Sequence, residues 1–201
     1  SCAIRLERKS CGICFDMARV IRFASLADLK AIDSLRRADQ EAVGFIPASR
    51  YESEIQRSCG TILAMTENDD LVGYAYWTRG WPIARIQQLV VRPDARRRER
   101  ATALVEAVAD EAKRHHWYGI SCRCRADLEA IEFWKSIGWR EIAIEQSGRR
   151  GPVIRFYKEL TPALFDLGDY MPPTPVSRQI SMRKGFKFLP EARLLLNSTQ
   201  T

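Results

Sequence analysis

Long apolar runs are missing from this sequence. None approaches the ~20 residues that a membrane-spanning helix needs, so the sequence excludes a transmembrane protein and predicts no contact with a membrane. The first 16 residues interleave charged and apolar side chains, whereas a secretory signal has a continuous hydrophobic stretch. A cytoplasmic protein is therefore expected.

Patterns that bind metals are also scarce. The 201 residues include six cysteines and two histidines. Cys11 and Cys14 have the C-x-x-C spacing of a zinc or redox pair, but a structural zinc ion needs four ligands, and no second C-x-x-C or H-x-x-x-H follows. Cys122 and Cys124 fit positions in a strand. We therefore expect no metal, no disulfide scaffold, and reduced cysteines.

The composition is that of a globular protein, with 46% hydrophobic and 28% charged residues, and the length suits one domain with short appendages. Residues 1–18 precede the first strand-like run and are predicted to be an N-terminal extension. Residues 19–160 carry the periodic pattern of a domain. Residues 161–201 contain a proline cluster and basic residues with scattered aromatics, which predict a linker and a basic tail.

Hydrophobic periodicity in residues 19–160 predicts strands that alternate with amphipathic helices. The expected strands are 19–23, 61–66, 71–77, 83–91, 118–124, 139–145 and 153–158. The expected helices cover 26–35, 51–58, 101–114 and 127–137. Ser25 is expected to cap the first helix, and residues 68–70 to join two strands as a hairpin. This order predicts an α/β protein with helices on the faces of a mixed sheet.

Of the net charge of +7, three units lie in one short segment. Residues 92–100 hold five arginines against Asp94 and Glu99, directly after a predicted strand and before a helix. The first turn of a helix leaves backbone N–H groups unpaired and carries a partial positive charge, so this segment suits a pyrophosphate group. The alternative is a solvated basic turn that caps the helix.

Two motifs in this part of the chain resemble those of the GNAT superfamily of acyl-CoA-dependent N-acetyltransferases. The first reads Val91-Arg-Pro93 and then Arg96-Arg-Arg-Glu99-Arg-Ala101, against V-x-P and R/Q-x-x-G-x-G/A in the family. The second begins at Asp127 and reads Asp-Leu-Glu-Ala-Ile-Glu-Phe-Trp-Lys-Ser-Ile-Gly-Trp, against N-x-x-A-x-x-F-Y-x-x-x-G-F. The resemblance implies a mostly antiparallel sheet with a splayed central pair of strands.

The resemblance also implies that acetyl-CoA is the co-substrate. It assigns acetyl-CoA binding to Leu89, Val90, Val91, Arg96, Arg97, Arg98, Glu99, Arg100, Ala101 and Thr102, together with Asp127 and Trp134 of the second motif. A backbone N–H group of the central strand would polarise the thioester carbonyl, because fixed donors stabilise the negative charge that amine attack places on that oxygen.

Three positions depart from the family pattern. Glu99 stands where the family has glycine, which places a carboxylate near the expected phosphates; alternatively it is a favourable acidic residue in the first turn of a helix. Trp134 replaces the tyrosine that often reprotonates the thiolate, and an indole N–H is not a useful acid. Asp127 replaces asparagine.

The sequence names no general base for the amine. Family members often carry a glutamate on the central strand, where this chain has Gln87 and Gln88. Glu41, Glu52 and Glu54 lie in the helical region that usually lines the acceptor cleft, and they are the candidates. The alternative for each is solvated surface.

We therefore predict an N-acetyltransferase that moves an acetyl group from acetyl-CoA to a primary amine of a small molecule or protein, by direct attack in a ternary complex. The acceptor would bind between residues 39–57 and the last two strands. The protein would be a monomer or a homodimer. The alternatives are a GNAT-shaped coenzyme A-binding or interaction module with weak or no catalysis, and an acetyltransferase acting on aminoacyl-tRNA through an RNA contact of the basic tail.

Overall fold

The computed structural model describes residues 19–57, 60–79, 83–97, 99–146 and 151–160, together with the backbone of 187–188. The predicted N-terminal extension and most of the predicted linker and tail lie outside these residues, so the division of the chain into three parts stays a prediction. Cys11 and Cys14 lie outside as well. Of the described residues, none belongs to a group of three or more potential metal ligands.

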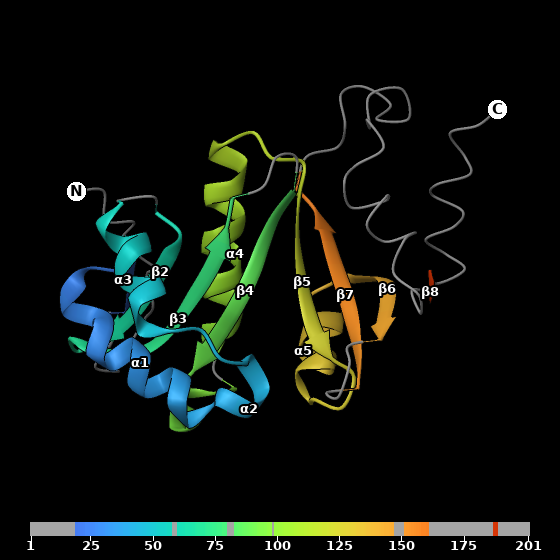
Figure 1. The fold of residues 1–201 in the computed structure, drawn as a ribbon. Helices are drawn as coiled ribbons and strands as arrows, with labels where there is room; N and C mark the ends of the chain where they lie inside the picture. Colours follow the sequence, from blue (N-terminus) through green and yellow to red (C-terminus); the bar gives the residue numbers. More distant parts are fainter. Residues whose placement is uncertain are drawn as a thin grey trace, which may run out of the picture.

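The described chain alternates strands and helices as the periodicity predicts (Figure 1). The elements are β1 (Arg19–Phe23), η1 (Leu26–Asp28), α1 (Leu29–Ala38), α2 (Gln40–Val43), α3 (Ala48–Gln56), β2 (Ile62–Glu67), β3 (Asp70–Thr78), β4 (Ile83–Val91), η2 (Pro93–Ala95), α4 (Arg100–Arg114), β5 (Gly119–Arg125), α5 (Ala130–Ser136), β6 (Arg140–Gln146), β7 (Pro152–Glu159) and β8 (Lys187–Phe188). None of the helices in the described segments has the length and apolar character needed to cross a membrane.

The strands form one sheet in the order β1-β2-β3-β4-β5-β7-β6-β8. Every neighbouring pair is antiparallel except β4 and β5, which are parallel and joined through α4. A parallel pair needs such a crossover connection, whereas antiparallel neighbours are joined by short turns. The predicted mixed, mostly antiparallel α/β fold is therefore confirmed.

Three helices differ by about three residues from the sequence prediction, and the sequence did not predict α2. The first helix continues to Ala38, beyond the predicted end at residue 35. α3 begins at Ala48, three residues early, because Pro47 supplies an extended N-cap. α5 begins at Ala130, three residues late, because residues 126–129 form turns. The short helix α2 has too few residues for a periodic signal; it ends at Gly44, whose φ of 77° suits glycine.

Two apolar clusters lie on opposite faces of the sheet. The larger one, beneath α4 and α5, includes the buried tryptophans Trp77, Trp117, Trp134 and Trp139. The smaller one lies beneath α1 and α3, against β2, β3 and β4, and consists of Ile32, Leu35, Tyr51, Ile62, Tyr74, Tyr76 and Val90. Cys122 and Cys124 of β5 are free thiols in the larger cluster, where burial raises the pKa of Cys124 to about 11.

A buried ion pair joins the start of α4 to the end of β2. Arg100 donates from Nε to Oε1 of Glu67 at 2.8 Å and from Nη2 to Oε2 at 2.5 Å, and both side chains are about 95% buried. Arg100 Nη1 also donates to the Ala95 carbonyl at 3.0 Å, and Arg19 adds a hydrogen bond to Glu67 at 3.1 Å. These contacts hold the loop before α4 against the sheet, and the hydrogen bond from Arg100 lowers the pKa of Glu67.

Replacing Glu67 by glutamine should destabilise the protein by about 3–5 kcal/mol, because the change leaves the buried guanidinium of Arg100 without a counter-charge. Urea unfolding followed by circular dichroism measures the difference. The matched control is Glu159→Gln, which removes an exposed partner 3.9 Å from Arg140 and should cost less than about 1 kcal/mol. An equal decrease in the unfolding free energy of the two variants would contradict the structural importance of the buried pair.

Asp28 makes the unfolding free energy depend on pH. Its carboxylate accepts two hydrogen bonds from Arg22, at 2.7 and 2.8 Å, and two from Ser25, the predicted cap residue. Burial raises the pKa of Asp28, but the hydrogen bonds outweigh it and lower the pKa to about 2. Because the folded-state pKa is below the unfolded value, this stabilisation is complete above about pH 4 and disappears as the pH falls toward 2.

Asp28→Asn should therefore lower the unfolding free energy by about 1.5–3 kcal/mol at pH 7, and the difference from the unmodified protein should shrink between pH 4 and pH 2. Denaturant unfolding at several pH values tests this expectation. Asp110→Asn, in an exposed pair with Lys113, serves as the control and should change the free energy by less than about 1 kcal/mol. A difference that does not vary with pH would contradict the role given to the Asp28 carboxylate.

Candidate functional site

The two parallel strands at the centre of the sheet separate along their length (Figure 1). β4 and β5 pair from Ile83 and Gly119 to Ile86 and Cys122, and there the pairing ends. Beyond that point β4 continues to Val91 against β3, and β5 continues to Arg125 against β7. The expected splayed pair is thus present; we use the term opening for the stretch in which the carboxyl-terminal halves of β4 and β5 have no backbone pairing with each other.

Peptide groups of β4 point into this opening. The register between β3 and β4 shifts at Gln87, which makes this residue a β-bulge where the parallel pairing ends. The Arg92 N–H donates to the Val72 carbonyl on β3 at 2.9 Å. Since peptide groups alternate between the two edges of a strand, those of Leu89 and Val91 face away from β3, toward β5.

The loop after β4 ends at the N-terminus of α4. Arg97 and Glu99 both have φ of 60°, a left-handed conformation that glycine adopts more easily, and Glu99 is the N-cap residue of α4. The first hydrogen bond of the helix runs from the Ala103 N–H to the Glu99 carbonyl, so the N–H groups before Ala103 have no acceptor within the helix. They can bind an anion beside the opening.

Most arginine side chains of this loop already have partners within the protein. Arg92 binds Asp94 at 2.7 Å, and Arg100 is buried against Glu67. Arg96 donates to the Val91 carbonyl at 3.0 Å and forms an ion pair with Asp39 at the junction of α1 and α2. Among the described arginines of the loop, Arg97 is exposed and has no hydrogen bond or ion pair; Arg98 lies outside the described residues.

Residues 30–160 match the family described as the acetyltransferase (GNAT) domain. The chain belongs to the GNAT acetyltransferase family. No curated protein matches the sequence significantly.

Solved GNAT structures share the fold at low sequence identity. Ard1 from Thermoplasma volcanium is 17% identical with a TM-score of 0.65, and the match covers 72% of this chain and 99% of that one. The ribosomal-protein-S18-alanine N-acetyltransferase from Escherichia coli is 21% identical with a TM-score of 0.61, covering 72% and 96%. A putative acetyltransferase from Salmonella typhimurium, solved with its cofactor acetyl-CoA, is 18% identical with a TM-score of 0.62, covering 74% and 97%.

Gln88 has a structural role in this GNAT domain. It is 2% exposed, and its side-chain oxygen accepts hydrogen bonds from the hydroxyl groups of Tyr51 and Tyr74. Its amide nitrogen donates to the carbonyls of Val43 and Gly44, at 3.2 and 3.3 Å. Each polar atom therefore has two partners, and the side chain fixes the end of α2 on β4 instead of acting on a substrate.

The three glutamates proposed as bases lie in different places. Glu41 is exposed on α2, and its carbonyl accepts a hydrogen bond from Arg125 at 2.8 Å, which places it beside the carboxyl-terminal end of β5. Glu52 is exposed on α3 and accepts a hydrogen bond from Gln56 at 3.3 Å. Glu54 is buried, with hydrogen-bonding and ionic partners in Thr61 at 3.0 Å and Arg50 at 2.8 Å.

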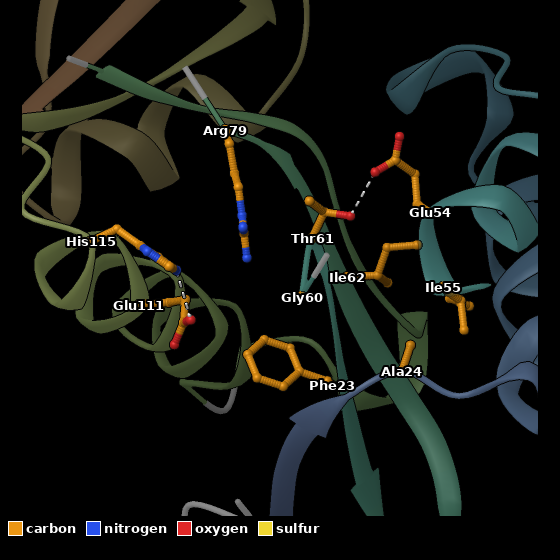
Figure 2. A pocket seen from close by; sticks show the side chains of 10 residues that line it. All are labelled: Phe23, Ala24, Glu54, Ile55, Gly60, Thr61, Ile62, Arg79, Glu111 and His115. Atoms are coloured by element: carbon orange, nitrogen blue, oxygen red, sulfur yellow. Dashed lines mark hydrogen bonds and ion pairs between the residues drawn. The ribbon is translucent and has the colours of Figure 1, made fainter. Parts of the chain in front are cut away.

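Glu54 lines a cavity of about 350 Å³ away from the splayed strands (Figure 2). On the other side of this cavity lie Arg79 and, from the carboxyl-terminal end of α4, Glu111 and His115, whose side chains are 3.3 Å apart. The loop that is predicted to bind the pyrophosphate is at the opposite end of α4, about 20 Å along the helix. The structure thus brings Glu41, but not Glu54, close to the opening.

The remaining predicted residues lie on β4, at the start of α4, and after β5. Asp127 is exposed and forms an ion pair with Arg125, whose hydrogen bond lowers the pKa of the Asp127 carboxyl group. Trp134 is 5% exposed and packs against Trp139 and Phe156, with ring centroids 4.7 and 6.5 Å away. Leu89, Ala101 and Thr102 are half-buried, whereas Val90 and Val91 are buried on opposite faces of the sheet.

Sequence reasoning missed the contacts that attach α2 to the two borders of the opening. The hydrogen bond from Arg125 to Glu41 joins α2 to the end of β5, and the pair of Arg96 with Asp39 joins the start of α2 to the loop before α4. The two residues of each pair are more than 50 positions apart, and no motif connects them. The alternation Cys-Arg-Cys-Arg in β5 was the available signal that arginines share one face of the sheet.

The Glu99 carboxylate should weaken the binding of acetyl-CoA. Glu99→Gly removes the negative charge and relieves the left-handed strain, so it should tighten binding severalfold and raise the unfolding free energy by less than about 1 kcal/mol. Isothermal titration and denaturant unfolding measure the two effects. Glu99→Gln is the control: it should tighten binding as well, but it keeps the strain and should not stabilise the fold. Unchanged affinity in both variants would contradict an unfavourable effect of the carboxylate.

Proposed function

We propose that this GNAT domain transfers an acetyl group from acetyl-CoA to a primary amine by direct attack within a ternary complex. The observation that supports this proposal most is the end of β4–β5 pairing after Ile86 and Cys122, next to the N-terminus of α4. Free peptide groups on a strand and free N–H groups on a helix then border one opening. Such donors fit the amide-containing arm and the pyrophosphate of coenzyme A.

Each part of the site would have a distinct role. The N–H groups at the start of α4 would hold the pyrophosphate, with the free guanidinium of Arg97 adding a charge-assisted hydrogen bond. When bound, acetyl-CoA supplies an acetyl group that is already activated as a thioester. The Leu89 N–H would donate to the carbonyl oxygen of that thioester and stabilise the charge that develops there during the attack.

The acceptor would approach from the face that carries α1, α2 and α3. Holding the amine beside the thioester supplies much of the acceleration, because it replaces a bimolecular encounter. A protonated amine cannot attack, and of the three candidate glutamates Glu41 is the one beside the opening. We therefore assign to Glu41 the removal of the proton, directly or through a water molecule.

Titration with acetyl-CoA and an assay of thiol release across a panel of amines test the function together. We expect saturable binding of acetyl-CoA and release of coenzyme A only when a suitable amine is present. Glu41→Gln should leave acetyl-CoA binding unchanged and lower kcat by about 10²–10⁴-fold. Glu52→Gln, on the exposed face of α3, is the matched control.

Two results would contradict parts of this proposal. If the protein does not bind acetyl-CoA at millimolar concentration, acetyl-CoA is not its co-substrate. Binding without thiol release for any amine would favour a coenzyme A-binding module, which is the alternative favoured by the occupied hydrogen-bonding groups of Gln88 and by the packing of Trp134 among aromatic rings.

A further inference from the structure

Three arginines and one glutamate gather on one face of the sheet, next to the point where β4 and β5 separate. Arg123 Nη2 lies 2.6 Å from Oε2 of Glu145, and Arg155 forms an ion pair with the other oxygen of the same carboxylate. Arg155 faces Arg123 across the β5–β7 pairing. Arg85 of β4 interacts electrostatically with all three residues. We refer to Arg85, Arg123, Arg155 and Glu145 as the arginine cluster.

The arginine cluster lies on the face where the acceptor is expected. In β4, Ala84 and Ile86 belong to the apolar cluster beneath α4 and α5, so Arg85 between them points to the opposite face. The same alternation applies to Arg123, which stands between two buried cysteines of β5. Two positions further, Arg125 reaches α2 on that opposite face. Figure 1 shows α1, α2 and α3 over the β1–β4 half of the sheet.

The charges in the arginine cluster do not balance. One carboxylate faces three guanidinium groups, and Glu145 already has ion pairs with Arg123 and Arg155. Among the described residues, Arg85 has no hydrogen bond or ion pair, and Nε of Arg155 is buried without a hydrogen-bond partner. Burial and the two neighbouring arginines lower the pKa of Arg85. Three cations beside a single carboxylate are unfavourable for stability unless a second anion joins them.

We propose that the arginine cluster binds a carboxylate or phosphate group of the acceptor, so that the acetylated amine belongs to an anionic molecule. This inference rests on the proposed transferase function and specifies its substrate class. Arg85 and Leu89 are four residues apart, about 13 Å along an extended strand. The acceptor would therefore carry its anion several atoms from the amine, as in an amino acid with a long chain or a peptide with an acidic residue near its N-terminus.

Glu145 has a positioning role in this arrangement. It holds Arg123 and Arg155 in place but cannot neutralise all three arginines, so a net positive charge remains for the ligand. Arg123 is 36% exposed, whereas Arg155 is 11% exposed. An anion can therefore reach the cluster from solvent beside Arg123 and meet the buried groups behind it.

Matched pairs of acceptors test the proposal with the full chain. One pair is 6-aminohexanoate and 6-aminohexanamide; the other is a C-terminally amidated tetrapeptide with glutamate or with glutamine at its third position. We expect kcat/KM to be roughly tenfold or more higher for the anionic member of at least one pair. The pair that shows the larger preference distinguishes a small molecule from a protein as the source of the anion.

Arg85→Gln should abolish this preference, while acetyl-CoA binding stays unchanged. Because Arg85 has no hydrogen bond or ion pair to lose and is repelled by Arg123 and Arg155, the thermal midpoint of the variant should be unchanged or higher, which separates loss of recognition from loss of folding. Arg114→Gln is the matched control, since this exposed arginine of α4 lies on the other face and should keep the preference. Equal use of neutral and anionic acceptors, or a preference that survives Arg85→Gln, would overturn the proposal.

Binding of glutarate, a dicarboxylate without an amine, separates this proposal from the transferase function. We expect glutarate to bind the unmodified protein and to bind Arg85→Gln at least several-fold more weakly, as measured by isothermal titration. If no amine releases coenzyme A but glutarate binding depends on Arg85, the transferase function fails and the anion site remains. If acetyl transfer occurs but glutarate binding does not depend on Arg85, the anion site is wrong and the transferase function remains.

Discussion

The separation of β4 from β5 is the constraint on which the rest of this structure depends. The two strands share only four facing residue pairs, whereas each continues to the end of its length against an antiparallel neighbour. Each half of the sheet can therefore keep its own twist, and the two halves diverge. The bulge at Gln87 marks the point of divergence. If β4 and β5 were paired along their whole length, the peptide groups of Leu89 would form hydrogen bonds with β5 and could not bind a ligand.

Polar contacts fix the borders of this opening. The ion pair of Arg100 with Glu67 holds the loop before α4 against the end of β2, and the ion pair of Arg96 with Asp39 joins the same loop to the start of α2. On the other side, Gln88 ties the end of α2 to β4 through two hydrogen bonds to the carbonyls of Val43 and Gly44, and it accepts two more from Tyr51 of α3 and Tyr74 of β3. Several charged groups of the basic segment thus serve rigidity. The free backbone N–H groups, more than the number of arginines, make the N-terminus of α4 suitable for phosphates.

The two faces of the sheet also differ in polarity along β5. Apolar side chains beneath α4 and α5 form the main core, and β5 contributes its two buried cysteines there. On the opposite face, the same strand carries Ser121, Arg123 and Arg125. A strand that is buried on one face and charged on the other can carry a binding surface without loss of core packing, because successive side chains point in opposite directions. The arginine cluster uses this property of the sheet.

The sequence by itself determined the order of the elements, because periods of two and of about 3.6 residues distinguish strands from helices. It placed β1 and β4 at their observed bounds and located the basic loop before α4. Only the tertiary structure decided which polar residues meet. Glu41 lies near Arg125, Glu54 faces a remote cavity, and Arg85 lies near the like charge of Arg155, because the strand order brings distant segments together. Periodicity assigns a side chain to a face, but the pairing of strands decides its neighbours.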